Sequence, residues 1–128
     1  MKTKSSPPAT IVTAGGVELA RNVKIAADFR DRAVGLLGRT ELDSDEGMLF
    51  EPGGSIHTLW MRMTIDVAFM DRELRVLKVS PAVRPWRMRF APRGTHFTLE
   101  LANGKLAACN LRVGEQLKIV PAGRGVAA

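Results

Sequence analysis

The chain has 128 residues, of which 45% are hydrophobic and 25% are charged, as in an ordinary globular domain. A chain of this length can bury one hydrophobic core without disulfides or a structural metal, and its composition excludes collagen-like, coiled-coil and disordered proteins. No apolar run approaches the roughly 18 residues that a membrane-spanning helix requires.

The net charge of +6 is unevenly distributed along the chain. Residues 74–99 contain no acidic residue, and their basic residues are Arg75, Lys78, Arg84, Arg87, Arg89 and Arg93. Residues 41–51 contain no basic residue, and their acidic residues are Glu41, Asp43, Asp45, Glu46 and Glu51. Such asymmetry can attract an anionic partner, or the two segments can face each other within one copy or between copies. Two solvated loops are the structural alternative.

The two ends of the chain are predicted to be flexible tails, residues 1–9 and 122–128, because neither shows an apolar period. One domain is expected between them, over residues 10–121. The first residues contain two lysines but neither an apolar core nor a cleavage site, so we expect a cytoplasmic protein. The single cysteine, Cys109, permits no internal disulfide, which fits a reducing compartment.

The first elements are predicted to form a β-meander. Apolar residues at positions 11–12 and 17–19 flank Gly15 and Gly16, a pattern that favours a hairpin with a glycine turn. Val23 and Ile25 predict a third short strand.

The apolar period then lengthens, which predicts a short helix over residues 28–38. Asp28 occupies the capping position with Asp31 three residues later, and Gly38 is a natural stop. The apolar face of this helix consists of Phe29, Ala33, Leu36 and Leu37. Gly35 inside the helix indicates close backbone packing or an early end.

The longest alternation covers residues 57–70, well beyond a typical strand of roughly five to six residues. A bend or break near Thr64 is therefore expected. The odd positions are nearly all apolar and predict a core face: His57, Leu59, Met61, Met63, Ile65, Val67 and Phe69. The even positions predict the opposite face: Thr58, Trp60, Arg62, Thr64 and Asp66.

Three later apolar runs predict strands near residues 74–79, 97–101 and 117–119. In total the sequence predicts roughly seven to nine short strands and one or two short helices. Because strands do not alternate with long helices, the predicted fold class is all-β, a single compact β-sandwich or jelly-roll-like barrel.

Four blocks of sequence, taken together, carry a family resemblance. They are RAVGLLGR at residues 32–39, EGMLFEP at 46–52, IHTLWMRMTIDVAFMDR at 56–72 and LELANG at 99–104. In this order they resemble the DUF192 family of small uncharacterised domains, also called UPF0127, over residues 23–120. RPW at residues 84–86 and Gly114 are similar to one branch of that family. The resemblance implies a compact β-rich fold, sandwich or jelly-roll in kind, and no assigned reaction.

Two positions depart from the family pattern. Leu74 stands where the turn after Phe69 usually ends in Asp-Gly, and Thr64 stands where a proline is common. The first departure argues against a tight glycine turn after Phe69.

Established catalytic motifs are absent from the sequence: it contains no HExxH, no P-loop, no GxSxG and no paired CxxC. With no tyrosine and two histidines, few general bases are available near pH 7. We therefore assign no catalytic residue, no metal and no cofactor, and favour a protein without catalysis of its own.

The predicted ligand-binding site combines charged and aromatic side chains: Arg32, Arg39, Trp60, Arg62 and Asp66, with Arg84 and Trp86 at its rim. If the predicted helix covers the polar face of the long strand, several guanidinium groups, an indole and a carboxylate converge there. Guanidinium groups suit carboxylates or phosphates, and tryptophan supplies an apolar wall. The structural alternative is that Asp66 pairs with one arginine and pins the helix to the sheet.

The predicted function is that of a non-catalytic binding or accessory module. Its ligand would be a small anion or an acidic segment of a partner protein. One alternative is a hydrolase or lyase that uses Asp66 as base and the arginines as anion clamps.

A second alternative is weak binding of single-stranded nucleic acid through residues 84–93. There the arginines are interleaved with Trp86 and Phe90, and stackable rings beside arginines are the ingredients of such binding. We rank it lower because one short basic loop neutralises few phosphates. The structural alternative is a proline-stiffened loop whose two rings pack on the edge of the sandwich.

A copper site is the only metal hypothesis that the sequence suggests. His57, Met61 and Met63 share one predicted strand face, with Met48 and Cys109 as possible additions, and such soft ligands suit Cu(I). Methionines on an apolar face are more often core residues.

Two further patterns also have simpler explanations. Asp43, Asp45, Glu46 and Gly47 could offer oxygens to calcium, but the twelve-residue loop pattern is absent, which favours a solvated acidic turn. Cys109 could act as a nucleophile with His57 or His96, but its apolar neighbours favour a buried position in a short helical turn.

Overall fold

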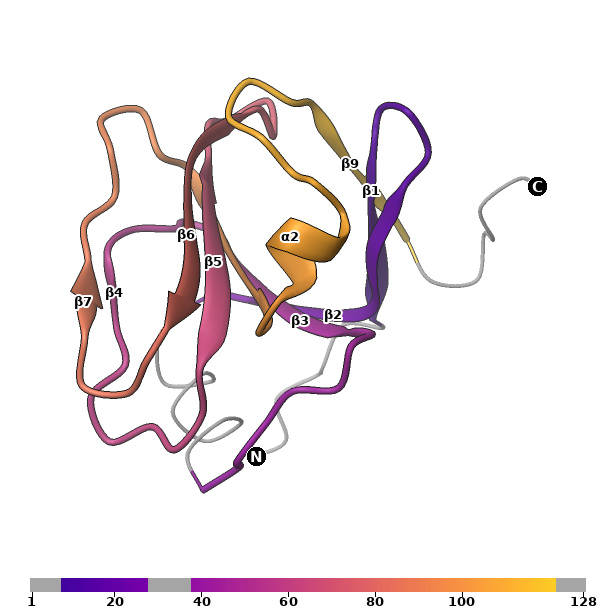
Figure 1. The fold of residues 1–128 in the computed structure, drawn as a ribbon. Helices are drawn as coiled ribbons and strands as arrows, with labels where there is room; N and C mark the ends of the chain where they lie inside the picture. The colour runs from indigo at the N-terminus through magenta and orange to yellow at the C-terminus, as the bar shows by residue number, and fades with distance from the viewer. Residues whose placement is uncertain (1–7, 28–37, 122–128) are drawn as a thin grey trace, which may run out of the picture.

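The computed structural model describes residues 8–27 and 38–121, which contain nine strands and one short helix (Figure 1). The helix predicted at residues 28–38 lies outside the described residues except for Gly38. Residues 1–7 and 122–128 of the two predicted tails also lie outside them.

Most strands belong to one mixed sheet with the order β6-β5-β8-β3-β2-β1-β9. These strands are β1 (Ala9–Thr13), β2 (Glu18–Ala26), β3 (Glu46–Phe50), β5 (Ile65–Met70), β6 (Val76–Val83), β8 (Phe97–Ala102) and β9 (Leu117–Val120). β2 and β3 are parallel, and the other neighbouring strands are antiparallel. A separate antiparallel pair consists of β4 (Ile56–His57) and β7 (Met88–Arg89). The all-β, sandwich-like fold expected from the sequence is confirmed.

The large sheet curls until its two edge strands approach each other at one end. An antiparallel bridge joins Arg75 to Gln116, and the Leu117 N–H donates to the Leu74 carbonyl at 3.0 Å. The short helix α2 (Lys105–Ala108) lies in the opening between the two edges (Figure 1). The sheet therefore remains open rather than closing into a barrel.

Hydrophobic side chains cover both faces of this sheet. The first core fills the inside of the curl beneath α2, and it includes Leu19, Leu49, Leu99, Leu101, Leu106 and Leu117. The second core lies on the other face, where it includes Met48, Phe50, Ile56, Met61, Met63 and Phe69. Central strands β5 and β8 contribute to both cores, so every residue of these two strands is buried.

The predicted hairpin at the start of the domain is confirmed, because β1 and β2 pair as antiparallel neighbours. The predicted meander is wrong. Val23 and Ile25 continue β2 instead of starting a third strand, and their backbone pairs in parallel with β3. A strand buried between two neighbours can extend past the first one to pair with the second, and alternation alone does not reveal this.

The long alternation at residues 57–70 is divided between two strands, and the expected break is confirmed because β5 begins at Ile65. Residues 58–64 leave the sheet, although Met61 and Met63 still point into the second core. The predicted polar face does not form: Asp66 is fully buried, while Trp60 is 70% exposed.

A tight turn follows Phe69 despite the missing glycine. Leu74 adopts a left-handed φ of 66°, and its N–H donates to the Asp71 carbonyl at 3.0 Å. The Asp71 side chain also accepts from the backbone N–H groups of Glu73 and Arg75, both at 2.9 Å. These hydrogen bonds stabilise a conformation that a leucine rarely adopts.

Candidate functional site

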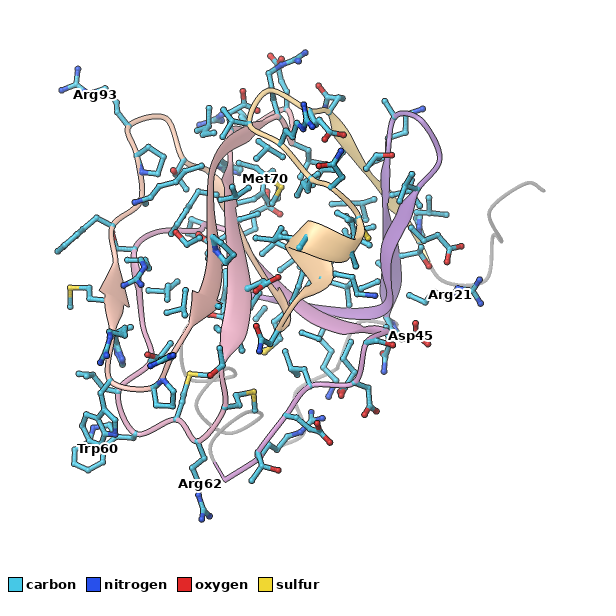
Figure 2. All side chains as sticks on the ribbon, in the orientation of Figure 1. Arg21, Asp45, Trp60, Arg62, Met70 and Arg93 are labelled. Atoms are coloured by element: carbon cyan, nitrogen blue, oxygen red, sulfur yellow. The ribbon has the colours of Figure 1, made fainter. Side chains whose placement is uncertain are left out.

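Two of the predicted site residues, Trp60 and Trp86, meet on the surface at one end of the molecule. Their ring centroids are 4.8 Å apart and their planes are inclined by 62°, an edge-to-face contact. The two side chains are 70% and 53% exposed, respectively. Figure 2 shows Trp60 pointing away from the body of the fold, on the side where β4 and β7 lie in Figure 1.

The backbone at both tryptophans is strained. Trp60 has a φ of 69° and Trp86 a φ of 64°, and the left-handed region costs a residue with a Cβ roughly 1–2 kcal/mol. Such conformations persist where the surrounding structure enforces them, and they are enriched at functional sites.

Thr58 provides that enforcement. Its side chain is fully buried, and its hydroxyl donates to the Arg84 carbonyl at 2.6 Å while accepting from the Arg87 N–H at 2.9 Å. Its backbone carbonyl accepts from the Trp86 N–H at 3.0 Å, and its N–H donates to the Arg87 carbonyl at 2.8 Å. One buried residue thus ties the loop of Trp60 to the loop of Trp86.

Other exposed apolar side chains continue from the tryptophan pair along β7. We name this surface the aromatic ridge, and it consists of Leu59, Trp60, Trp86, Met88 and Phe90. Met88 and Phe90 are each at least half exposed. Met88 and Phe90 lie two residues apart, at the start of β7 and just after its end, and Trp86 precedes them in a turn. The ridge therefore continues from this turn along β7.

Five arginines lie close to the ridge residues in the sequence. We name them the ridge arginines: Arg62, Arg84, Arg87, Arg89 and Arg93. None of them forms an ion pair with any residue that the structure describes. Figure 2 shows that Arg62 and Arg93 both extend away from the body of the fold. The Arg89 guanidinium donates to the Met88 carbonyl at 2.8 Å.

Asp66 lies away from this surface and joins three elements of the fold. One carboxylate oxygen accepts from the Ala82 N–H of β6 at 2.9 Å, and the other accepts from the Leu106 N–H of α2 at 2.8 Å. The side chain is fully buried. A base must reach its substrate, so this position is incompatible with the Asp66 base of the hydrolase or lyase alternative. Within the described residues, no arginine pairs with Asp66 either.

Arg39, another predicted site residue, forms an ion pair with Glu46. Its guanidinium donates to both carboxylate oxygens of Glu46, at 3.0 and 2.5 Å. These hydrogen bonds hold the pKa of Glu46 below its usual range and raise the pKa of Arg39. Arg32 lies outside the described residues. The structure therefore brings together Trp60 and Trp86 but separates them from Asp66.

An open hollow of about 400 Å³ lies beside Arg62, and its walls are formed by Thr40, Glu41, Leu42, Arg62, Thr64, Ala102 and Asn103. Among the predicted site residues that the structure describes, Arg62 is the one in these walls. The carboxylate of Glu41 shares the hollow with this guanidinium and repels an anion, so the hollow is poorly suited to a small anionic ligand.

The residues of the copper and cysteine-nucleophile hypotheses do not form a site. Met61 and Met63 are core side chains, and His57 is exposed. Cys109 ends α2, packs partly against the first core and points its thiol at the Glu18 carbonyl, 3.6 Å away. Over the described ranges, no three His, Cys, Asp or Glu side chains are grouped to hold a metal.

Sequence reasoning missed two residues of this site. Thr58 is the buried residue that ties the two loops together, and Met88 lies in the middle of the ridge. Thr58 was placed only as one residue of a polar strand face, because its role depends on residues 84–87 of a distant loop. Met88 gave no signal because a lone methionine usually belongs to a core. Glu100 was missed as well, and it is fully buried on β8 between Met48 and Val67.

In residues 8–27 and 38–121, no helix has the length and apolar character needed to cross a membrane.

The geometry defines a sandwich-like β domain that carries an aromatic, arginine-rich surface at one end. The chain belongs to the DUF192 family, described as "Uncharacterized ACR", whose family model matches residues 10–119. It is 28% identical over 106 residues to a UPF0127 protein of Pyrococcus furiosus, covering 80% of this chain and 90% of the relative. It is 30% identical over 99 residues to a UPF0127 protein of Pyrococcus abyssi, covering 75% of this chain and 84% of the relative.

Two crystal structures share this fold. A protein of unknown function from Novosphingobium aromaticivorans superimposes with a TM-score of 0.73 at 24% identity, covering 87% of this chain and 83% of its own. A protein described as a putative transcription regulator from Sinorhizobium meliloti superimposes with a TM-score of 0.75 at 20% identity, covering 91% and 98%, respectively. At these identities the likeness establishes the fold alone.

Proposed function

We propose that this protein is a non-catalytic binding module that recognises an anionic ligand at the aromatic ridge. The observation that carries the proposal is the tryptophan pair. Two large apolar rings are held in strained, solvent-exposed positions on loops that the buried Thr58 ties together. Exposed apolar surface of this kind is characteristic of interaction sites, and tryptophan and arginine dominate the energetics of many interfaces.

The sign of the ligand's charge follows from the ridge arginines. Four of these five arginines lie within residues 74–99, which contain no acid. None of the five guanidinium groups forms an ion pair with the described part of the chain. Guanidinium groups bind carboxylates and phosphates through paired hydrogen bonds. A cluster of one charge also speeds the encounter with a ligand of opposite charge.

The geometry supports binding over catalysis. The carboxylate of the enzyme alternative, Asp66, has both oxygens occupied by backbone N–H groups.

Cys109 is half-buried at the end of α2 and is not disulfide-bonded. A free thiol suits the reducing cytoplasm, where we place the protein.

The chain itself supplies the probe for a test. It contains no tyrosine and two tryptophans, both in the ridge, so its intrinsic fluorescence reports on this site. Titration of the full chain with poly-L-glutamate at low salt should change the tryptophan emission in a saturable way.

Two variants of equal charge separate a site from general electrostatic attraction. Arg84→Gln, beside the tryptophan pair, should weaken the response several-fold. Arg21→Gln should leave it unchanged, because Arg21 lies on β2 and pairs with Glu18. No emission change with the polymer, or an equal loss in both variants, would refute the proposal.

A further inference from the structure

We infer that the ligand of the aromatic ridge is an extended segment of a partner protein in which acidic and apolar side chains alternate. The inference rests on the proposed function, since it names the ligand of the same surface. It commits the ridge to a protein partner, in place of a small anion, a nucleic acid or a lipid surface.

The ridge is a line and not a pocket. Trp60 and Arg93 lie toward opposite ends of one flank of the molecule (Figure 2), and β7 runs along that flank between them (Figure 1). Met88 and Phe90 are two residues apart at β7, and the tryptophan pair lies before them at the turn of Trp86. Alternate side chains of an extended chain are about 7 Å apart, so a partner segment lying alongside β7 would place its own alternate side chains at the interval between Met88 and Phe90.

The charges along this line match an acidic segment. Arg84 and Arg62 belong to the loops of the tryptophan pair, Arg93 belongs to the far end, and Arg87 and Arg89 lie between them in the chain. An extended segment turns successive side chains to opposite sides. Its apolar side chains can therefore contact the ridge while its carboxylates reach the arginines at the flanks.

The backbone beneath this line is held in place. The Lys78 ammonium donates to the Phe90 carbonyl at 3.0 Å, and the Ala91 N–H donates to the Ser55 hydroxyl at 2.8 Å. Thr58 holds the opposite end at Arg84 and Arg87. A surface ordered before binding loses less conformational entropy when a flexible segment docks on it.

Other ligands fit this geometry less well. A small anion needs a concave site, and the hollow beside Arg62 contains the carboxylate of Glu41. Nucleic-acid bases stack on the open faces of aromatic rings, whereas Trp60 and Trp86 contact each other edge to face, with planes inclined by 62°. A lipid surface does not require exposed apolar side chains in a line along β7.

The test compares two labelled synthetic peptides of about eight residues, enough to cover the ridge in extended form. One alternates glutamate and leucine, and the other has the same composition with its glutamates and leucines in two separate blocks. Fluorescence anisotropy measures the binding of each peptide to the full chain. We expect the alternating peptide to bind at least tenfold more tightly than the block peptide.

A matched pair of surface variants locates the contact. Met88→Ser removes an exposed apolar side chain from the middle of the ridge and should weaken the alternating peptide at least fivefold. Val113→Ser removes an exposed apolar side chain from the turn before β9 and should leave its affinity unchanged. Because both side chains are exposed, neither change removes a core contact.

The remaining outcomes separate this inference from the proposed function. The inference of an alternating segment is overturned if the two peptides bind with equal affinity, or if both Met88→Ser and Val113→Ser lose binding of the alternating peptide. A response of the tryptophan emission to a single-stranded oligonucleotide or to phosphatidylserine vesicles, with both peptides silent, overturns the protein partner but retains an anion-binding ridge. If poly-L-glutamate does not change the emission, both proposals fall.

Discussion

Replacement of Thr58 by valine should loosen the tryptophan pair and lower the stability of the fold. Valine has nearly the shape of threonine but no hydroxyl, so the bonds to the Arg84 carbonyl at 2.6 Å and from the Arg87 N–H at 2.9 Å are lost. A typical intramolecular hydrogen bond contributes about 1 kcal/mol net, and a buried partner left unsatisfied costs more. Two such bonds give an expected loss of about 2 kcal/mol in the free energy of unfolding.

The assay combines urea unfolding with near-ultraviolet circular dichroism, a signal to which the two tryptophans in contact contribute. Thr58→Ser is the control, because it keeps the hydroxyl and removes one methyl group, worth roughly 0.8 kcal/mol. The serine variant should retain the tryptophan signal and the valine variant should lose it. A valine variant with unchanged dichroism, and with a loss below about 0.5 kcal/mol in the free energy of unfolding, would refute the role of Thr58 in tying the two loops together.

Three further predictions concern the rest of the fold. Gly53→Ala should cost about 2 kcal/mol, because its Cβ would lie 2.4 Å from a backbone nitrogen of β8, whereas Gly54→Ala, with no atom within 4 Å, should be nearly neutral in the same urea assay. Asp66→Asn should cost about 2 kcal/mol, because the amide turns a donor toward one of two backbone N–H groups; equal unfolding midpoints would contradict this. Arg39 lowers the pKa of Glu46 in the folded state, so this pair adds stability above the unfolded pKa and loses it as the pH falls through the folded pKa. Arg39→Gln should therefore be less stable than wild type at neutral pH, with the difference vanishing in acid; a difference that is constant with pH would argue against the pair.

Local patterns predicted several strands well. The apolar runs near residues 97–101 and 117–119 correspond to β8 and β9, and the glycine turn at residues 15–16 joins β1 to β2. The pattern at residues 57–70 misled in one respect, because alternation continues through residues 58–64 after the chain has left the sheet. Met61 and Met63 are buried there by packing against the second core, not by membership of a strand.

The candidate site was predicted in part. Trp60, Arg62, Arg84 and Trp86 were chosen for their chemistry, and the structure brings the two tryptophans into contact. Asp66 was assigned to the same face because it shares their even numbering. The odd positions from Met61 to Phe69 face the second core, so Asp66 faces the first core, beside α2, whereas Trp60 and Arg62 in the loop are exposed. The Asp66 carboxylate is satisfied by N–H groups of β6 and α2, which the sequence could not have named.

The sequence by itself determined the all-β class, the family and the separation of basic from acidic segments, because these follow from composition, alternation and order along the chain. Only the tertiary structure decided that both faces of the central strands are buried. It also decided that Trp60 contacts Trp86, on two loops that Thr58 ties together. The physical reason is that alternation specifies which side chains share a face, whereas the element that covers this face comes from a distant part of the chain.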